Sequence, residues 1–434
     1  MLVTGALLLH ASPLSAQPTT AVAADFRFDL GPVPRAAGHT LVSAATTYTP
    51  DLGHGFDFGC RPIDDANGIV TGTSPLFFSV KVPEGNYRVT VTLGGAGTES
   101  QTTVRTESGH LMLADVKTMA GQTVTHEFIA NVRRPTLPPP PRNAPGDARV
   151  NMFLPGEAEA WHWDEKLTIE FNGTKPCVSA ITIKKDDAVP TIFIAGDSTV
   201  GDPRRGPGGN WPTQLCQYFK PTVAVCNSAE GGETSKSFIT GARFDKVLSQ
   251  MKPGDFFLVQ FGHNDSKKNW PQSYTEPATS FKAYLKVYIE ETRRRDGTIV
   301  FVTPMERRDN GDSVGPWARA MREVAAVEKV PVIDGWAMSK ELWTAMGPSV
   351  GTAFSDVTHL SSYGGYLLSK NIVKGIRGNV PELAKHLVDD IKELDLSNID
   401  PRPAYLSQPS GPGGPSGRGP GSLPATVPAG GAGQ

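Results

Sequence analysis

The periodicity of apolar residues changes at about residue 190, and this change limits the folds that the chain can adopt. Before it, apolar and polar residues alternate over short stretches, which is typical of strands with one buried face. These stretches include residues 76–82, 87–93 and 166–171, and turn-forming residues separate them at 83–86, 94–95 and 172–173. Short strands at this spacing predict a β-sandwich.

After residue 190, short apolar runs alternate with longer stretches of helical periodicity. The runs are residues 192–195, 223–225, 256–259, 299–302 and 330–333, and the clearest helical stretches are 278–295 and 317–328. Strands that are apolar throughout are buried on both faces of their sheet. The pattern therefore predicts an α/β domain whose parallel sheet lies between two layers of helices.

A chain of 434 residues is too long for one ordinary core, so we expect several segments. They are a signal-like segment at 1–24, the β-sandwich at 25–187, the α/β domain at 188–398 and a disordered tail rich in Pro and Gly at 399–434. Within the sandwich, residues 135–146 include four consecutive prolines, which exclude a central strand and predict an exposed loop.

The formal net charge is −2, so no overall field attracts nucleic acid or an acidic membrane surface, and we expect neither as a partner. No apolar run reaches the roughly 20 residues of a membrane-spanning helix. Apolar residues 2–9, followed by small residues up to Ala16, resemble a secretory signal that lacks a positive start. We expect a secreted or periplasmic monomer, and a disordered apolar tail is the alternative for this segment.

Four cysteines, Cys60, Cys177, Cys216 and Cys226, are compatible with export. Only the pairing of Cys60 with Cys177 and of Cys216 with Cys226 keeps both disulfides within one domain. Free buried thiols are the alternative. The cysteines lack the spacing of zinc ligands, so we expect no metal, and no cofactor is indicated either.

Ser198 directly follows the first strand predicted for the α/β domain, in the sequence Gly196-Asp197-Ser198. Ligands bind at the carboxyl ends of the strands in open parallel sheets, so a serine here can act as a nucleophile. A cap of the next helix is the alternative interpretation.

Asp356 and His359 lie three residues apart near the end of the α/β domain. A carboxylate that accepts the imidazole Nδ1–H leaves Nε2 available to take a proton from serine. A surface Asp–His pair, or a cap of the helix expected near Ser362, would explain the same residues.

Gly232 and Asn264 follow the second and third strands predicted for the α/β domain. Glycine allows close approach of the backbone and an unobstructed N–H, and a carboxamide can donate to an oxyanion. Each can also be a plain turn residue, and Asn264 begins a glycosylation sequon. With Ser198, Asp356 and His359 they supply a nucleophile, a base, its orienting group and oxyanion donors, so we interpret the set as catalytic.

The four groups of residues around Ser198, Gly232, Asn264 and His359 resemble, in this order, the four sequence blocks of the GDSL/SGNH hydrolases. The resemblance implies a flavodoxin-like three-layer α/β/α fold and ester hydrolysis through an acyl-enzyme. Segments 194–199, 261–265, 303–308, 332–334 and 356–364 are similar to one branch, the rhamnogalacturonan acetylesterases. The sandwich resembles the galactose-binding-like domain that precedes some bacterial members.

This resemblance implies that Ser198 attacks an acetyl carbonyl, while His359 acts as general base and then as general acid. Asp356 would orient His359. The Ser198 N–H, the Gly232 N–H and the Asn264 side chain would form the oxyanion hole, with Gly231 as the alternative to Gly232. Many relatives have Gly-Arg-Ser where this chain has Gly-Glu-Thr at residues 232–234, and this departure puts the fine substrate specificity in doubt.

An acetylated pectic polysaccharide, rhamnogalacturonan, is the substrate that the resemblance implies. An acetylesterase or lipase acting on acetylated xylan, another acetylated glycan or a lipid is one alternative, and an inactive carbohydrate-binding relative is another. Aromatic and basic residues near the blocks could contact a sugar polymer, although each is explained better as a core aromatic or a solvated charge. They are Trp211, Trp270, Trp317, Arg204, Lys236, Lys267 and Arg307.

Overall fold

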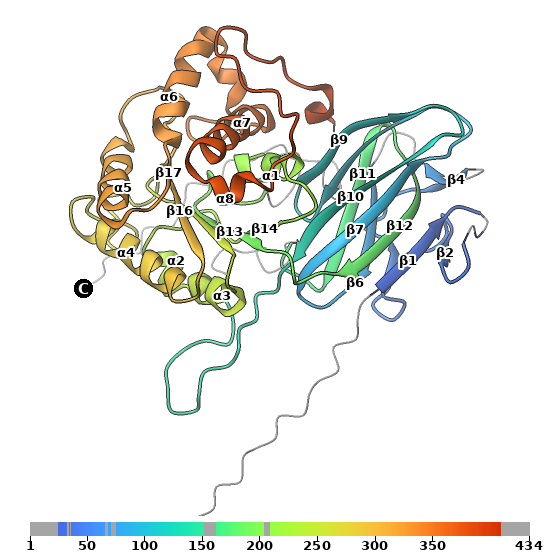
Figure 1. Ribbon diagram of the computed structural model, residues 1–434, viewed down its shortest axis with the longest axis horizontal. Coiled ribbons are helices and arrows are strands. Elements are labelled where there is room, and N and C mark those ends of the chain that lie inside the picture. The colour runs from blue at the N-terminus through green and yellow to red at the C-terminus, as the bar shows by residue number, and fades with distance from the viewer. Residues whose placement is uncertain are drawn as a thin grey trace, which may run out of the picture.

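The computed structural model describes residues 25–408, apart from residues 33, 35, 66–67, 71–74, 152–161 and 204–208. The signal-like segment predicted at 1–24 and the part of the predicted tail beyond residue 408 lie outside these residues. Figure 1 shows a body of β-strands beside a body in which helices surround a sheet. The change of periodicity near residue 190 therefore marks a change of architecture.

Two sheets form the body of β-strands. Its described strands are β1 (Asp25–Leu30), β2 (Thr40–Val42), β3 (His54–Phe56), β4 (Ile63–Asp65), β5 (Gly68–Val70), β6 (Leu76–Lys81), β7 (Gly85–Gly94), β8 (Ser100–Thr106), β9 (His110–Thr118), β10 (Thr123–Val132), β11 (Lys166–Lys175) and β12 (Cys177–Lys185). One sheet has the order β10-β7-β12-β1-β2, with β5 on β12 and β4 on β5, and the other has the order β3-β6-β11-β8-β9. The predicted β-sandwich is confirmed.

The sandwich core follows from the alternation of apolar and polar residues in its strands. Alternate residues of β7, from Tyr87 to Leu93, are completely buried. Across the core, the ring of Phe78 meets Phe28 and Phe56 edge-on, with centroids 5.1 and 5.6 Å apart. Aromatic rings in this geometry add attraction between ring edges and faces to the burial of apolar area.

The turn predicted at residues 172–173 is wrong, because β11 continues through it. The register of β11 against β8 shifts between Asn172 and Lys175, and Gly173 has a φ of 143°. A Cβ atom on Gly173 would lie 2.0 Å from the carbonyl oxygen of Gln101. Glycine therefore allows a bulge that lies close to the neighbouring strand, and the strand does not end.

A five-stranded parallel sheet forms the centre of the second body, in the order β14-β13-β15-β16-β17. Its strands are β13 (Thr191–Gly196), β14 (Ala224–Asn227), β15 (Phe256–Gln260), β16 (Thr298–Val302) and β17 (Val332–Ile333). This is the flavodoxin-like strand order. All five predicted runs contain strands, and the last is shorter than predicted because Pro331 has no N–H to donate to a ladder.

Helices cover both faces of the parallel sheet. They are α1 (Trp211–Leu215), η1 (Cys216–Tyr218), α2 (Ser237–Thr240), α3 (Arg243–Gln250), α4 (Ser280–Arg293), α5 (Gly315–Glu328), α6 (Gly335–Met346), η2 (Gly347–Ala353), α7 (Ser362–Asn379), α8 (Pro381–Ala384) and η3 (Ala404–Ser407). Strand residues such as Ile194 and Leu258 pack with α1, α6 and α7, whereas their neighbours Phe193 and Phe257 pack with α3, α4 and α5. The predicted three-layer α/β/α fold is confirmed.

The proline-rich segment of the sandwich is an exposed loop, as predicted. Residues 141–149 are exposed, and the segment is held at its base by pairing of Thr136 with Arg149. Figure 1 shows it projecting beyond the helices and strands.

The prediction of a disordered tail from residue 399 is wrong for residues 399–408, because these residues pack on the α/β body. Leu406 is buried, and the Tyr363 hydroxyl donates to the Asp400 carbonyl at 2.5 Å. Lys370 also pairs with the Asp400 carboxylate. Single contacts of this kind leave no periodic pattern in a segment rich in Pro and Ser, so the sequence did not predict them.

All four cysteines are free, so neither of the disulfides considered above is formed. Cys177 and Cys226 are completely buried. Burial raises the pKa of the Cys226 thiol to about 11, which keeps it protonated and unreactive at neutral pH. The alternative interpretation of the four cysteines, free thiols, is therefore the one that the structure shows.

Buried charges join the sandwich to the α/β body. Asp202, in the loop after β13, accepts from His110 Nε2 at 2.9 Å and from Arg133 at 2.6 Å. All three side chains are about 1% exposed. Burial lowers the pKa of His110, but the Asp202 carboxylate more than offsets this and raises it to about 10, while the thiol of Cys216 also faces the ring. His110 is therefore a buried imidazolium at neutral pH.

We predict that this interface loses stability in alkaline solution. A raised pKa means that protonated His110 stabilises the fold fully below the pKa of an unfolded histidine, about 6.5, and that this stabilisation is lost as the pH rises towards about 10. The free energy of unfolding of the wild-type protein should therefore fall between pH 7 and pH 10, as measured by denaturant titration, and His110→Gln should flatten this fall. His54→Gln, which changes an imidazole outside the interface, is the control. Equal slopes in the wild-type and His110→Gln proteins would contradict the assignment.

Candidate active site

The predicted catalytic residues come together at the carboxyl edge of the parallel sheet. Ser198 lies two residues after β13, Gly232 follows β14, and Asn264 follows β15. These three strands are neighbours in the sheet, so their following loops meet at one place. Asp356 and His359 reach the same place from the segment before α7.

Ser198, His359 and Asp356 form a continuous chain of hydrogen bonds. The Ser198 Oγ lies 2.9 Å from His359 Nε2, and His359 Nδ1 lies 2.7 Å from Asp356 Oδ2. An ionised carboxylate only accepts, so Nδ1 carries the proton in this arrangement and Nε2 accepts from the serine hydroxyl. A general base must lie within this reach of the proton that it removes.

The Asp356 carboxylate is held in its ionised form by hydrogen bonds. Partial burial raises its pKa, but the backbone and side-chain N–H groups of His359 and the backbone N–H of Thr358 together bring the pKa below its usual value. The two backbone bonds to Asp356 Oδ1 are 2.7 and 2.6 Å long. Asp356 therefore stays negative at neutral pH and fixes the tautomer of His359.

The segment that carries Asp356 and His359 is supported from the loop after β16. Arg307 Nε donates to Thr358 Oγ1 at 3.1 Å, and the Arg308 backbone N–H donates to the Val357 carbonyl at 3.1 Å. Phe354 pairs with Leu360 across the base of the segment. These contacts restrict where the imidazole can lie, although its side chain is 44% exposed.

A buried polar network holds the turn that carries Ser198. Asp197 Oδ1 accepts from the backbone and hydroxyl of Thr199, and its other oxygen lies 3.4 Å from His263 Nδ1. Burial raises the pKa of Asp197, but His263 and Thr199 outweigh it and lower the pKa. Asn210 Nδ2 donates to the carbonyl of Ser198 at 2.9 Å. The position of the serine is thus fixed from both sides of the turn.

The loop after β14 contains both glycines considered for the oxyanion hole. Gly232 has a φ of 89°, a conformation that side chains with a Cβ rarely adopt. Gly231 lines the pocket beside Ser198, and its N–H donates to Glu230 Oε1 at 2.8 Å. Asn264 Nδ2 donates to the Glu233 carbonyl at 3.0 Å, which orients its amide and leaves a second N–H on the same nitrogen.

A pocket of about 310 Å³ lies beside Ser198 and His359. Its lining is mostly polar or glycine and comprises Ser198, Gly201, Asp202, Pro203, Gly209, Asn210, Glu230, Gly231, Ser355, His359 and Leu360. Among the described residues, no group of three or more His, Cys, Asp or Glu side chains could hold a metal ion. In that part of the chain, no helix is both long and apolar enough to cross a bilayer.

Known proteins are similar to this part of the chain. Residues 194–365 match the GDSL-like lipase/acylhydrolase family. The probable rhamnogalacturonan acetylesterase YesY of Bacillus subtilis is 34% identical over 201 residues, which cover 43% of this chain and 92% of that protein. The rhamnogalacturonan acetylesterase RhgT of the same organism is 33% identical over 221 residues, 45% of this chain and 94% of that protein.

The chain belongs to the GDSL-like lipase/acylhydrolase family. It is a carboxylic-ester hydrolase. A third relative, the uncharacterized esterase YxiM of Bacillus subtilis, is 26% identical over 350 residues, 74% of this chain and 82% of that protein, so this similarity extends into the sandwich.

Glu233 is the position at which this GDSL hydrolase departs from the Gly-Arg-Ser of many relatives. Burial raises the pKa of its carboxyl group to about 7, so this acid is only partly ionised at neutral pH. Arg243 Nε lies 3.1 Å from Glu233 Oε1, and both side chains are almost completely buried. The Arg243 guanidinium also lies over the ring of Trp163, 5.6 Å from its centroid. A guanidinium is therefore present beside the loop after β14, but it comes from α3 instead of from the loop itself.

Some residues of the site were missed by the sequence interpretation. Asn210 holds the Ser198 turn, and Asp202 and Glu230 line the pocket. Asn210 stands immediately before Trp211 and Pro212 at the start of α1, a helix-start signal that could have drawn attention to it. Asp202 has its cationic partners on the sandwich, and no sequence pattern links residues so far apart.

The residues considered for sugar contacts differ in their exposure. Trp211 and Trp317 are core residues whose indole N–H groups donate to Gln260 and to the Thr275 carbonyl. Trp270 is 62% exposed. Lys267 is exposed, and Lys236 donates to the Pro271 carbonyl. Arg307 supports the Asp356–His359 segment, and Arg204 lies outside the described residues.

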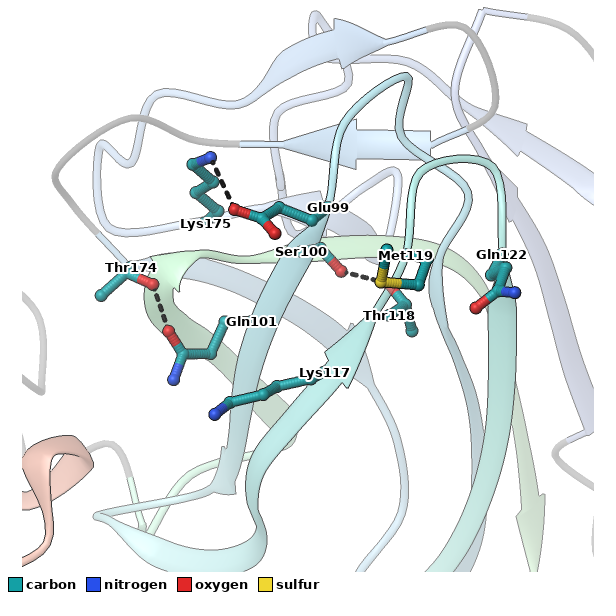
Figure 2. Close-up of a pocket in the computed structure, with 9 residues that line it drawn as sticks. All are labelled: Glu99, Ser100, Gln101, Lys117, Thr118, Met119, Gln122, Thr174 and Lys175. Carbon is teal, nitrogen blue, oxygen red and sulfur yellow. Dashed lines mark hydrogen bonds and ion pairs between the residues drawn. The ribbon is translucent and has the colours of Figure 1, made fainter.

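A second cavity, of about 400 Å³, lies on the sandwich. Figure 2 shows that polar side chains around it pair with one another: Lys175 with Glu99, Thr174 with Gln101, and Ser100 with Thr118. No aromatic ring is among the residues that line it. The cavity therefore lacks the flat apolar face on which a sugar ring stacks.

We predict that Arg307→Met lowers esterase activity about 10-fold or more, because small displacements of reacting groups are costly. The substitution removes the bond to Thr358 and loosens the segment that carries Asp356 and His359. The matched control is Arg308→Met, in which the exposed side chain changes but the backbone bond to Val357 is kept. The kcat of both variants on p-nitrophenyl acetate provides the test, and equal values would show that the Arg307 side chain does not position the imidazole.

Proposed function

We propose that this chain is a serine acetylesterase that removes acetyl groups from a pectic polysaccharide of the rhamnogalacturonan type. The geometry of Ser198, His359 and Asp356 is the observation that carries the proposal. The substrate is inferred from the two Bacillus relatives that are named rhamnogalacturonan acetylesterases and that this chain covers almost completely.

The proposed reaction starts with attack of the Ser198 Oγ on the acetyl carbonyl, while His359 Nε2 takes the hydroxyl proton. Asp356 stabilises the imidazolium that forms. Collapse of the tetrahedral intermediate breaks the bond to the sugar oxygen, which leaves with the proton from His359. Water, which gives a proton to His359, then attacks the carbonyl of the acetylated serine. The bond to the Ser198 Oγ breaks, the proton passes from His359 to this oxygen, and acetate leaves.

An oxyanion hole at the loop ends is the second part of the proposed mechanism. Negative charge develops on the carbonyl oxygen during attack, and preset N–H donors stabilise it in the transition state. We assign the Ser198 N–H, the Gly232 N–H and the Asn264 amide to this role. The anchoring of Asn264 to the Glu233 carbonyl supports the assignment, because the amide needs no reorientation during the reaction.

The pocket beside Ser198 supports a short acyl group on a polar alcohol. Its apolar side chains are Pro203 and Leu360, which is too few to solvate a long alkyl chain. Asn210 and Glu230 offer hydrogen-bonding groups of the kind that sugar hydroxyls use. An acetylated glycan therefore fits the lining of this pocket better than a lipid ester does.

The loop after β15 offers a surface for the polymer. Trp270 is exposed there, and Lys267 and Lys268 are exposed beside it in the chain. Lys236 reaches the same segment through its bond to the Pro271 carbonyl. An aromatic face packs against sugar rings and ammonium groups attract uronate carboxylates, so this loop is the proposed contact for the substrate backbone.

Compartment and domain division belong to the same proposal. A polymeric pectic substrate lies outside the cell, so we propose export. We also propose the sandwich at 25–187 and the esterase from residue 188 through residue 408 as separate domains, because their shared boundary falls between the end of β12 and the start of β13. The chain would act as a monomer without a cofactor.

We predict acetate release from acetylated rhamnogalacturonan in preference to acetylated xylan, with little activity on long-chain p-nitrophenyl esters. Trp270→Ala should lower kcat/KM on the polymer several-fold, because stacking on one aromatic face is lost, and leave p-nitrophenyl acetate hydrolysis unchanged. The control is Met119→Ala, which changes an exposed apolar side chain on the sandwich. Measurement of acetate by a coupled assay provides the test.

Three outcomes would contradict the proposed function. Faster release from acetylated xylan would identify another glycan as the substrate. Preference for long acyl chains would contradict a carbohydrate substrate altogether. Glycan binding without acetate release by the wild-type protein would identify an inactive binding protein.

A further inference from the structure

We propose that the β-sandwich supplies positioning residues for the esterase reaction. Arg133 and Trp163 of the sandwich, together with His110, hold the two loops that carry Ser198 and the oxyanion donors. The inference rests on the catalytic roles proposed above for those loops. It gives the sandwich a function in catalysis that does not depend on sugar binding.

The nucleophile loop is held at Asp202, four residues after Ser198. Its Oδ2 accepts from Arg133 at 2.6 Å, and its Oδ1 accepts from His110 at 2.9 Å and from Asn227 at 2.7 Å. Asn227 also donates to the Val200 carbonyl at 2.9 Å. Two cations from the sandwich and one amide from the end of β14 thus fix a carboxylate that lines the pocket beside Ser198.

Arg133 is also connected, through Trp163 and Arg243, to the loop after β14. Its guanidinium lies 4.9 Å from the centroid of the Trp163 ring, and Arg243 lies 5.6 Å from the same ring. Arg243 in turn pairs with Glu233, whose carbonyl accepts from the Asn264 amide at 3.0 Å. The indole of the sandwich therefore contacts both the arginine that holds the nucleophile loop and the one that holds the oxyanion loop.

Burial makes these contacts rigid. The side chains of His110, Arg133 and Asp202 are 1% exposed, and those of Arg243 and Glu233 are 2% exposed or less. Charges that are taken out of water interact strongly, and a partner that is left alone cannot be solvated. Movement of the nucleophile loop would therefore separate the buried Asp202 carboxylate from His110 and Arg133, and movement of the oxyanion loop would separate Glu233 from Arg243.

Other contacts between the two bodies provide a comparison, because the partners that they join, Glu84, Thr136 and Thr191, are outside these loops. Lys246 pairs with Glu84 at 2.7 Å and donates to the Thr136 carbonyl at 2.8 Å. Asn86 donates to Thr191, the first residue of β13, at the opposite end of the strand from Ser198. If the sandwich served only to stabilise the esterase body, the loss of Lys246 and the loss of Arg133 would have similar effects on catalysis.

The test compares Arg133→Met with Lys246→Met in the full chain, using p-nitrophenyl acetate as the substrate. Circular dichroism and thermal unfolding give the folded fraction, and a fluorophosphonate probe gives the rate of Ser198 labelling. We expect Arg133→Met to lower kcat and the labelling rate about 10- to 100-fold per folded molecule, with KM changed less than about twofold. Lys246→Met should lower the melting temperature but keep kcat within about twofold of the wild-type value.

A double-mutant cycle shows whether Arg133 acts through Asp202. Asp202→Asn removes the charge that Arg133 holds, so adding Arg133→Met to it should cause little further loss of kcat. If the losses of kcat in the two single variants simply add in the double variant, the proposal is overturned. Unchanged kcat in Arg133→Met, or an equal loss in Lys246→Met, would overturn it too.

Trp163→Leu keeps the proposal testable if Arg133→Met does not fold, because it removes the ring without leaving a buried charge alone. A several-fold loss of kcat at unchanged KM supports the proposal, and wild-type kcat contradicts it. Failure of the proposed function would look different. In that case the wild-type protein itself would not hydrolyse the ester, or Ser198→Ala would hydrolyse it at the wild-type rate.

Discussion

Parallel pairing of β13 with β14 and β15 is the constraint on which the site depends. These strands are buried on both faces, and their apolar residues alternate between two layers of helices. Polar side chains of these strands stand at the strand ends, and the other polar groups of the site lie in the loops at the carboxyl edge. Three segments that are distant in the sequence are thereby brought to one place, and the segment before α7 adds the imidazole and its carboxylate.

Much of this arrangement could be predicted because it is local. The Ser198, Gly232 and Asn264 segments each follow an apolar run, and a parallel sheet brings the ends of such runs together. The interval of three residues between Asp356 and His359 likewise lets one side chain contact the other. By contrast, the sequence at Gly173 was interpreted as a turn, whereas the residue forms a bulge. Glycine after asparagine is common in both structures.

Long-range charge pairing could not be predicted. Asp202 is bound by Arg133 and His110, and Glu233 is bound by Arg243. The sequence around each acid does not indicate which distant residue is its partner. The tail near Asp400 shows the same limit. Its packing depends on Lys370 and Tyr363 of α7, and its own composition indicated disorder. Such contacts become visible only when the fold is known, and here they connect the sandwich to the loops of the site.

The account depends most on Ser198 as the group that becomes acylated, and a direct measurement is available. The full chain is mixed with p-nitrophenyl acetate, quenched in acid during the first turnovers and digested for peptide mass spectrometry. We expect one acetyl group on the peptide that contains Ser198, and none on that peptide in Ser198→Ala, which should also lose turnover. An acetyl group on another residue, or undiminished turnover by Ser198→Ala, would contradict the account.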